Sequence, residues 1–502
     1  MLKSVRYWII VLSCCFSTVS CSNSSAGDNK NSTGNDILID SNIVNANFSG
    51  NGVQWGGYDM VESWTGSATL PESDWAKLFK RIRFMRPPLV RIMVSPGWNY
   101  MIDREFAPEK SNPVLCKILS FCQDEDIRVV FGEWGHQGGD TIDQEWLENS
   151  VKFLDWLINT KGFNCIHFFN MVNEPNGDWS SIKGNYSLWL SLMQQFHAKL
   201  VQKGLDSKVT LIGPDVAVWD AGLVSWVNNT VSDLNGKVEA FDIHTYPTET
   251  KVRDGSYRLM TGKYHEAAPA GKEVLVGELG FKYKTTSELG IQNLQRIAAD
   301  KFASDDCNMF VYDAFYAVDI ADAMIQNMLE GYGGNILWDL DDAMYNVGGS
   351  TSTKLKRWGF WNILGSEKFE NADDENIRPW FYTTSLLCRY FPRGAKIHSV
   401  SLPDKYGLRA VTGEFNGRYT IAIVNSHKVS YTINLKMLKG TYFENMKIYK
   451  YLSGEGVKFT AKTDQDGFAL PESSGEKIDL TNGNSFSVVM PAQSFYLMTN
   501  IE

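Results

Sequence analysis

Two glutamates follow directly on apolar segments of the sequence. Glu174 ends the run in FFNMVNEPNGDW (residues 168–179), where Pro175 comes next, and Glu278 ends the run in VLVGELGF (274–281). Proline donates no backbone hydrogen bond and fixes its own φ, so a strand must stop at residue 175. The carboxyl end of a buried strand is where α/β proteins usually place their chemistry. Taken singly, each glutamate is also consistent with an ordinary strand-to-loop junction.

Two carboxylates that face each other across a cleft can hydrolyse a glycosidic bond. In the retaining mechanism one protonates the leaving oxygen and the other attacks the anomeric carbon, with the carboxyl groups about 5–5.5 Å apart. We therefore expect Glu174 and Glu278 to point into one mouth. Burial and the negative charge of Glu278 predict a raised pKa for Glu174. With seven histidines and no HExxH motif, the sequence predicts no metal ion and no other cofactor.

The elements that must position these glutamates are repeated βα units. From about residue 50 to 390, short β-branched or aromatic runs alternate with longer amphipathic stretches such as residues 185–202, the pattern of a (β/α)8 TIM barrel of the α/β class. The strand candidates are GVQW (52–55), LVRIMV (89–94), IRVVFGEW (127–134), CIHFFNMVN (165–173), VTLIGPD (209–215), EAFDIHTY (239–246), VLVGELGF (274–281) and NILWDL (335–340).

A second texture begins after residue 393. Short alternating strands are divided by Gly, Asn, Asp and Ser turns, which predicts a C-terminal antiparallel β-sandwich. The segment DILIDSNIVNANF (36–48) also predicts a strand, which could pair with this sandwich. We expect a signal peptide at 1–21, a tether at 22–36, the catalytic barrel at 37–395 and the sandwich at 396–502.

Four further residues on the predicted strands fit a sugar site. Arg91 in an apolar strand is costly unless paired, so it is expected to hold Glu278 ionised, although a structural salt bridge is the alternative. Tyr246 can donate its hydroxyl to the nucleophile, and His244 can line the subsite or serve as a core histidine. Trp338 can form the floor beneath the reacting sugar or belong to the barrel core.

Together these residues resemble the pattern of the clan A glycoside hydrolases, retaining (β/α)8 enzymes, with a C-terminal sandwich like that of families 30 and 39; the clan also includes family 5. The resemblance implies that Asn173 binds a 2-hydroxyl group and that Glu174 is the acid/base. It implies that Glu278 is the nucleophile. The strand-end residues that match the family pattern on strands two, six and eight are Arg91, His244, Tyr246 and Trp338.

Two loops carry weaker signals. FGEWGHQGGD follows the third strand, so Glu133, Trp134 and His136 could contact substrate or simply stabilise a glycine-rich loop. We include Trp134 among the substrate-binding candidates. The acidic stretch after strand eight could bind hydroxyl groups, but a solvated loop is the favoured interpretation for Asp339, Asp341 and Asp342.

The N-terminus predicts a bacterial lipoprotein. A basic start and an apolar run, residues 7–19, precede TVSC, which resembles a lipobox with Cys21 as the lipidated residue; Cys14 or Cys15 is the alternative. We expect anchoring at the outer membrane, facing the cell surface or the periplasm. The remaining cysteines are odd in number and have no metal-ligand spacing, so we expect buried thiols: Cys116, Cys122, Cys165, Cys307 and Cys388.

Composition indicates the kind of partner. A net charge of −10 argues against nucleic acid, and an aromatic content of 13% suits sugar binding. The sequence thus predicts a monomeric hydrolase that cleaves β-glycosidic bonds of a polysaccharide with retention, as an endo-glycanase. An exo-acting β-glycosidase on oligosaccharides and a non-catalytic carbohydrate-binding lipoprotein are the alternatives.

Overall fold

The structure, a computed structural model, describes residues 34–58, 70–344, 346–347 and 354–502. The predicted signal peptide, the lipidation site Cys21 and most of the tether lie outside these residues, so they stay predictions. Within the described residues, no helix has the length and apolarity needed to cross a membrane. The five cysteines of this part of the chain are free thiols, and four of them are buried.

Eight parallel strands close into a barrel, which confirms the predicted fold class. The predicted segment LVRIMV coincides with its strand to the residue, and the other seven are displaced by a few residues at their ends. In order around the barrel, the strands are β2 (Gly52–Gln54), β3 (Leu89–Val94), β6 (Arg128–Glu133), β7 (Ile166–Asn170), β8 (Thr210–Val218), β9 (Ala240–Thr245), β10 (Glu273–Leu279) and β11 (Gly334–Leu337).

A layer of apolar side chains fills the interior of the barrel toward the amino ends of the strands. Seven of the eight strands each contribute one buried side chain to it. This apolar layer closes the barrel interior beneath the polar groups at the carboxyl ends of the strands. The surroundings of these polar groups therefore have a low dielectric constant on that side, which strengthens charge interactions. Its members are Leu89, Val130, Phe168, Ile212, Ala240, Leu275 and Ile336.

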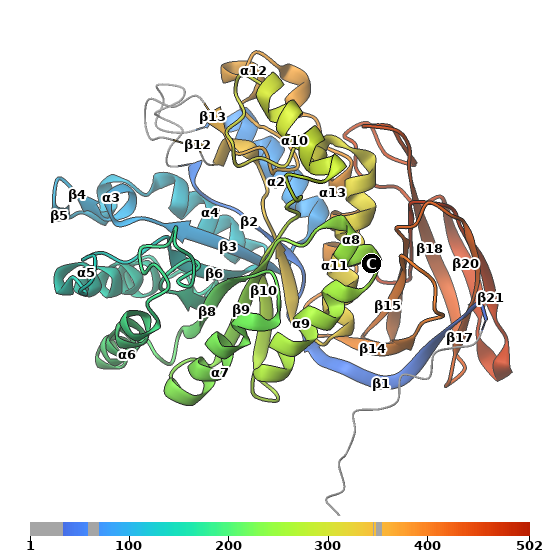
Figure 1. The fold of residues 1–502 in the computed structure, drawn as a ribbon, viewed down its shortest axis with the longest axis horizontal. Helices are drawn as coiled ribbons and strands as arrows, with labels where there is room; N and C mark the ends of the chain where they lie inside the picture. The colour runs from blue at the N-terminus through green and yellow to red at the C-terminus, as the bar shows by residue number, and fades with distance from the viewer. Residues whose placement is uncertain (1–33, 59–69, 345, 348–353) are drawn as a thin grey trace, which may run out of the picture.

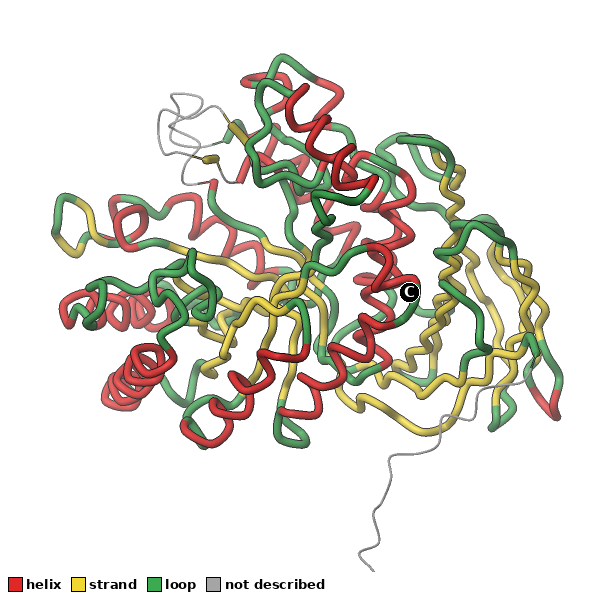
Figure 2. Tube along the Cα trace, viewed as in Figure 1, coloured by secondary structure: helices red, strands yellow, loops and turns green. Residues whose placement is uncertain are grey.

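Helices surround these strands, as Figure 2 shows in red around yellow. On α6 (Tyr186–Lys203) the buried residues are the five that the helical spacing predicted: Trp189, Leu192, Met193, Phe196 and Leu200. The other helices are α2 (Glu72–Met85), α3 (Pro96–Asn99), α4 (Pro113–Asp124), α5 (Gln144–Asp155), α7 (Val224–Asp233), α8 (Glu249–Arg253), α9 (Ser256–Ala267), α10 (Glu288–Ala299), α11 (Ala314–Leu329), α12 (Gly365–Lys368) and α13 (Trp380–Arg389).

The C-terminal part is one ten-stranded sheet that curls on itself, in place of two separate sandwich sheets. The N-terminal strand β1 (Asp36–Phe48) lies inside it, antiparallel to β14 and parallel to β17, and crosses to it beneath the barrel (Figure 1). The other strands are β14 (Ala395–Ser401), β15 (Leu408–Phe415), β16 (Arg418–Asn425), β17 (Tyr431–Met437), β18 (Tyr442–Ser453), β19 (Phe459–Ala461), β20 (Ser473–Asp479), β21 (Phe486–Met490) and β22 (Ser494–Thr499).

Helix α11 lies between the barrel and this sheet and is buried along nearly its whole length. Its first residue, Ala314, donates its backbone N–H to the carbonyl of Gly456 at 2.7 Å and accepts a hydrogen bond from the Tyr451 hydroxyl at 2.9 Å. Near its middle, Asp322 accepts a hydrogen bond from Ser426 at 2.7 Å. The sheet therefore supplies both apolar cover and polar partners that the barrel needs.

Deleting residues 396–502 should leave an insoluble barrel, because α11 would expose apolar surface and lose the hydrogen bonds from Tyr451 and Ser426. The intact chain should unfold in a single calorimetric transition. A soluble barrel fragment with wild-type activity would contradict this expectation.

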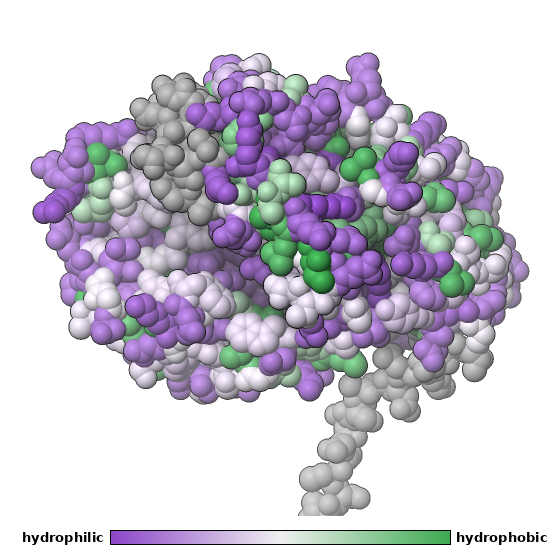
Figure 3. Space-filling model, turned by 45° about the horizontal axis from the view of Figure 1, so that its top comes forward, coloured by the Kyte–Doolittle hydropathy of each residue, from purple (hydrophilic) through white to green (hydrophobic). Residues whose placement is uncertain are grey.

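The outer surface is mostly hydrophilic on the face seen in Figure 3, with hydrophobic side chains in small groups around a hollow. Apolar side chains scattered in this way are common on the surfaces of folded domains.

Candidate active site

A cleft of about 640 Å³ opens at the carboxyl ends of the barrel strands. The structure brings all eight predicted site residues together there. This is expected, because the carboxyl ends of all strands of a closed parallel barrel meet at one opening. Arg91 lies just beneath the cleft, against Glu278. The other seven line its walls: Trp134, Asn173, Glu174, His244, Tyr246, Glu278 and Trp338.

Glu278 sits on β10 with both carboxylate oxygens held. Arg91 on β3 donates to Oε1 at 2.6 Å, and the Tyr246 hydroxyl donates to Oε2 at 2.5 Å. Arg91 is wholly buried, and its other nitrogen donates to Asn173 at 2.7 Å and to Asp215 at 3.2 Å. A buried guanidinium paired in this way makes charge-assisted hydrogen bonds that hold the Glu278 carboxylate in position.

Glu174 lies just after β7 in a left-handed backbone conformation, with φ of 46°. Its N–H donates to the Asp215 carbonyl at 3.1 Å, which fixes this unusual turn. On its side chain, Oε2 accepts from the Trp179 indole at 2.6 Å and Oε1 lies 3.1 Å from His244 Nδ1. A contact on each oxygen therefore holds the Glu174 carboxylate in place in the wall of the cleft.

Carboxylate oxygens of Glu174 and Glu278 lie within 4.8 Å of each other, with His244 Nδ1 between them. His244 Nδ1 is 3.1 Å from Glu174 Oε1 and 3.5 Å from Glu278 Oε2. The two oxygens are thus near enough to each other to be consistent with the carboxyl separation of about 5–5.5 Å in retaining pairs.

His244 has a carboxylate at each ring nitrogen. Nε2 lies 2.8 Å from Asp215 Oδ1, and Nδ1 contacts Glu174. An ionised carboxylate only accepts, so with Asp215 and Glu174 ionised both ring nitrogens donate and the ring carries a positive charge. Burial alone would lower the pKa of His244, but the negative charges of Asp215 and Glu278 raise it well above its ordinary value.

The pKa of Glu174 lies below its ordinary value, and the prediction of a raised pKa is wrong. Burial does raise the pKa, as expected, but the hydrogen bond and positive charge of His244 outweigh burial, and the Trp179 hydrogen bond adds to them. The prediction counted the carboxylates around Glu174 and left out the protonated histidine between them.

Asp215, which sequence reasoning did not single out, lies at the centre of this network. It is fully buried at the bend of β8, in contact with Arg91 and His244. Burial raises its pKa, but the charges of His244 and Arg91 outweigh that effect and leave the pKa below its ordinary value. The signal was present, since Asp215 ends the predicted strand VTLIGPD as the two glutamates end theirs.

Loop residues complete the walls of the cleft. On the Glu174 side, Trp179 and Trp219 have exposed fractions of 63% and 53%, and such rings can stack on sugars. On the Glu278 side the loops bring in three charged residues that no strand pattern could reveal, Lys282, Asp306 and Lys356, together with the ring of Trp358.

Two of the weaker candidates lie away from the cleft. Glu133 accepts hydrogen bonds from Tyr100 and Trp146, both at 2.8 Å, and from Ser150 at 2.5 Å. Burial raises the pKa of Glu133 to about 7 despite these bonds. His136 is buried against the Trp146 ring. Both therefore stabilise the loop and helix α5, the second of the interpretations that the sequence left open.

The acidic stretch after β11 is buried, so its interpretation as a solvated loop is wrong. Asp341 accepts hydrogen bonds from Tyr58 at 2.7 Å and Trp361 at 3.0 Å. Asp342 pairs with Arg378 at 2.5 Å. Asp339 is 1% exposed, and burial raises its pKa well above the ordinary value. Arginine and tryptophan partners far along the chain neutralise or satisfy the acidic groups, which local sequence does not reveal.

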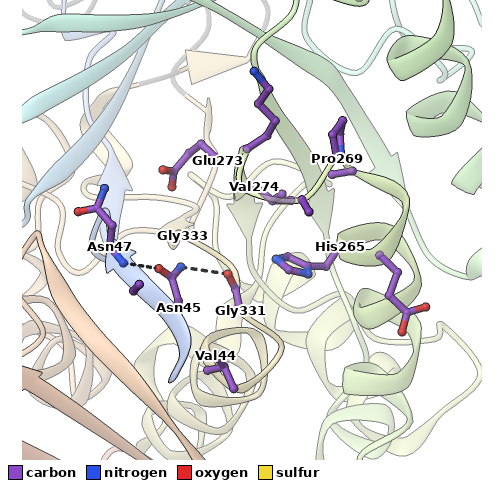
Figure 4. Close-up of a pocket in the computed structure, with 15 residues that line it drawn as sticks. Val44, Asn45, Asn47, His265, Pro269, Glu273, Val274, Gly331 and Gly333 are labelled. Atoms are coloured by element: carbon purple, nitrogen blue, oxygen red, sulfur yellow. Dashed lines mark hydrogen bonds between the residues drawn. The ribbon is translucent and has the colours of Figure 1, made fainter. Parts of the chain in front are cut away.

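A second cavity, of about 570 Å³, lies at the opposite ends of the strands. Figure 4 shows it between β1 and the starts of β10 and β11, where Asn45 donates to the Gly331 carbonyl at 3.0 Å. It is separated from Glu174 and Glu278 by the length of the barrel.

The fold is shared with several glycoside hydrolases of known structure. The sequence matches no protein-family model, and no curated protein matches it. A GH30 endoxylanase from Clostridium papyrosolvens C71 aligns with 92% of this chain and 99% of its own, at 12% identity and a TM-score of 0.56. A family 51 α-L-arabinofuranosidase from Bifidobacterium longum aligns over 93% and 100%, at 12% identity and 0.62.

A GH39 enzyme from Xanthomonas axonopodis pv. citri aligns over 92% of this chain and 96% of its own, at 11% identity and a TM-score of 0.55. The resemblance to glycoside hydrolases predicted from the sequence is thus confirmed for the fold. The alignments cover both the barrel and the C-terminal sheet, since each spans more than nine-tenths of this chain.

Proposed function

We propose that the protein is a retaining glycoside hydrolase that cleaves β-glycosidic bonds of a polysaccharide. The observation that carries this proposal is the pair of carboxylates within 4.8 Å at the barrel mouth. Their surroundings differ as two roles require, with Arg91 and Tyr246 on Glu278 and Trp179 and His244 on Glu174. A module that only binds sugar has no need of two opposed carboxylates.

In the first step, an oxygen of Glu278 attacks the anomeric carbon while the bond to the leaving oxygen breaks. Arg91 and Tyr246 fix the carboxylate, so little reorganisation is needed as its charge moves into the new bond. Glu174 gives its proton to the leaving oxygen. The product of this step is a covalent glycosyl ester of Glu278.

The proton for that step is held jointly by Glu174 and His244. In the empty cleft Glu174 is ionised and His244 is a cation, and their contact of 3.1 Å allows the proton to pass to Glu174 as the leaving oxygen takes it. In the second step, Glu174 takes a proton from water, which attacks the ester and releases the sugar with retained configuration.

Exposed aromatic rings support action on a chain of sugars. Trp179 and Trp219 are exposed and line the same cleft as Glu174, so they can stack on further sugar units. An exo-acting β-glycosidase remains the second candidate, because the same fold serves an endoxylanase and a monomeric β-xylosidase. The latter also supports the expectation of a monomer.

A screen on polysaccharides and aryl glycosides tests the proposal. The panel should include xylans, other β-glycans and an aryl α-L-arabinofuranoside, since an arabinofuranosidase shares the fold. Proton NMR of the first-formed product should show retained anomeric configuration. Binding of polysaccharide with no hydrolysis of any substrate would favour the non-catalytic alternative, and inverted product would refute the mechanism.

Replacing His244 with asparagine should move the basic limb of the pH profile of kcat/KM downward by roughly one to three pH units. In the wild type the site keeps its proton up to the raised pKa of His244, so activity persists above neutral pH. Without the cation, the basic limb reports Glu174 alone, and we expect this carboxyl group to lose its proton at a lower pH than the raised pKa of His244. His197→Asn on α6 is the control. An unchanged basic limb would show that His244 does not hold the proton.

A further inference from the structure

Two lysines line the wall of the cleft that carries Glu278. Lys356 Nζ lies 3.0 Å from one carboxylate oxygen of Asp306, and Lys282 Nζ lies 3.8 Å from the other. All three side chains line the same cleft as Glu278. One carboxylate thus faces two ammonium groups, and the second contact is too long for a good hydrogen bond.

Aromatic rings fix the position of Lys282. Its Nζ lies 4.8 Å from the centroid of the Tyr246 ring and 5.9 Å from that of Trp358. The Tyr246 hydroxyl donates a hydrogen bond to Glu278. The Tyr246 ring therefore lies between Lys282 and the attacking carboxylate. The exposed fraction of its side chain is 58%, which leaves the ammonium group open to a ligand.

Lys356 is more enclosed. The exposed fraction of its side chain is 32%. Burial lowers its pKa, but the negative charges of Asp306, Glu278 and Asp339 outweigh burial and raise the pKa above its ordinary value. Lys356 is therefore a cation close enough to Glu278 to interact with it electrostatically.

Positive charge at this place works against cleavage of a neutral sugar. The glycosyl group becomes oxocarbenium-like in the transition state, so a nearby ammonium group raises the barrier. The two ammonium groups share the single carboxylate of Asp306, with the short contact at Lys356 and the long one at Lys282. An anionic group on the sugar would supply the missing charge, and it would gain a charge-assisted hydrogen bond in return.

We propose that the glycosyl unit held beside Glu278 carries an anionic substituent, a carboxylate or a sulfate, which binds between Lys282 and Lys356. This assignment rests on the proposed function, because it uses Glu278 to define the reacting sugar. The protein as a whole has a net charge of −10, so selectivity for anions comes from this pair and not from general attraction. A lysine ammonium group acts as a compact positive charge, so it can bind either a carboxylate or a sulfate.

Binding of small sugars to the whole protein tests the inference. The probes are glucuronate, galacturonate and galactose 6-sulfate, each compared by NMR titration with neutral glucose or galactose. The uronates and the sulfated sugar distinguish the two sources of charge. We expect at least one anionic sugar to bind tighter than its neutral counterpart by roughly 10-fold or more, with the preference shrinking as salt rises.

Three variants should change the preference for anionic over neutral sugars, two of them in one direction and the third in the other. Lys282→Met and Lys356→Met should remove the anion preference, whereas Asp306→Asn should strengthen it by removing the competing carboxylate. Lys405→Met is the matched control, because Lys405 also lies on a tyrosine ring, 5.0 Å from the Tyr431 centroid, but in the loop between β14 and β15, away from the cleft. Loss of anion binding in Asp306→Asn, equal affinity for neutral and anionic sugars, or no binding of any anionic sugar would overturn the inference.

A kinetic arm separates this inference from the proposed function. The wild type should hydrolyse an aryl β-uronide or a sulfated aryl glycoside faster than the neutral aryl glycoside, and Lys282→Met should narrow the ratio of kcat/KM. Selective binding of anionic sugars without turnover of any glycoside would refute the hydrolase proposal and support the binding assignment. Turnover with no preference for the anionic substrate would do the reverse.

Discussion

Replacing Glu278 with alanine should abolish hydrolysis of every ordinary substrate. Among the described residues, Asp215 is held beneath the cleft by Arg91 and His244, and Glu174 and Asp306, which line the cleft, are engaged by His244 and Lys356, so we expect none of them to attack in its place. We expect kcat to fall by a factor on the order of 10⁴ or more, since the covalent route is lost altogether. Glycoside turnover followed with an aryl substrate measures the effect.

The alanine variant also opens a space for a small external nucleophile. Azide entering from the Glu278 side should give a glycosyl azide with inverted configuration, identified by proton NMR. Glu278→Gln is the control, because it keeps oxygen and bulk beside Arg91 but leaves no space for azide. Thermal unfolding of both variants checks that the loss is chemical, since Arg91 loses a charged partner in each. Wild-type activity in Glu278→Ala would refute the assignment.

The framework of the site could be predicted because strands carry strong local signals. LVRIMV has a single charged residue in an apolar run, and burial makes such an arginine informative: Arg91 must find a partner, and Glu278 is that partner. Glu174 and Asp215 likewise end apolar runs. In a closed parallel barrel all such ends meet at one mouth, whatever their separation in sequence.

The loops could not be predicted in the same way. Lys282, Asp306 and Lys356 come from three loops with no periodic pattern, and only the folded chain places them beside Glu278. The acidic residues after β11 were misread for a related reason. Asp342 is paired with Arg378, and no local property of the sequence indicates that an arginine 36 residues later covers it.

The error over Glu174 has the same origin. Its burial was visible in the predicted strand end and does raise its pKa, and the acidic neighbour that adds to this effect is Asp215 and not Glu278 as expected. The charge of His244 depends on Asp215, which contacts the second ring nitrogen, Nε2. A histidine between three carboxylates is a cation, and that inference needs the geometry of all three.

Replacing Glu174 with alanine should give a different kinetic result from replacing Glu278, because the covalent intermediate can still form. Glu174→Ala removes protonation of the leaving group, worth typically about 10²–10⁴-fold on ordinary substrates. The dinitrophenolate leaving group of a dinitrophenyl glycoside needs little protonation. The glycosyl group of this substrate should therefore still form the ester with Glu278. The ester should then accumulate, because no base activates water, and mass spectrometry of the intact protein should detect it.

Azide decides between the two roles. In Glu174→Ala it should attack the accumulated ester and restore turnover, giving a glycosyl azide of retained configuration. Alanine at φ of 46° is strained by about 1–2 kcal/mol, so Glu174→Gly, which tolerates this conformation, is the matched control and should behave identically in kinetics. An inverted azide from Glu174→Ala together with a retained one from Glu278→Ala would exchange the acid and the nucleophile. The geometry argues against that exchange, because Arg91 and Tyr246 both hold Glu278 in place, whereas Glu174 meets the cation that can return its proton.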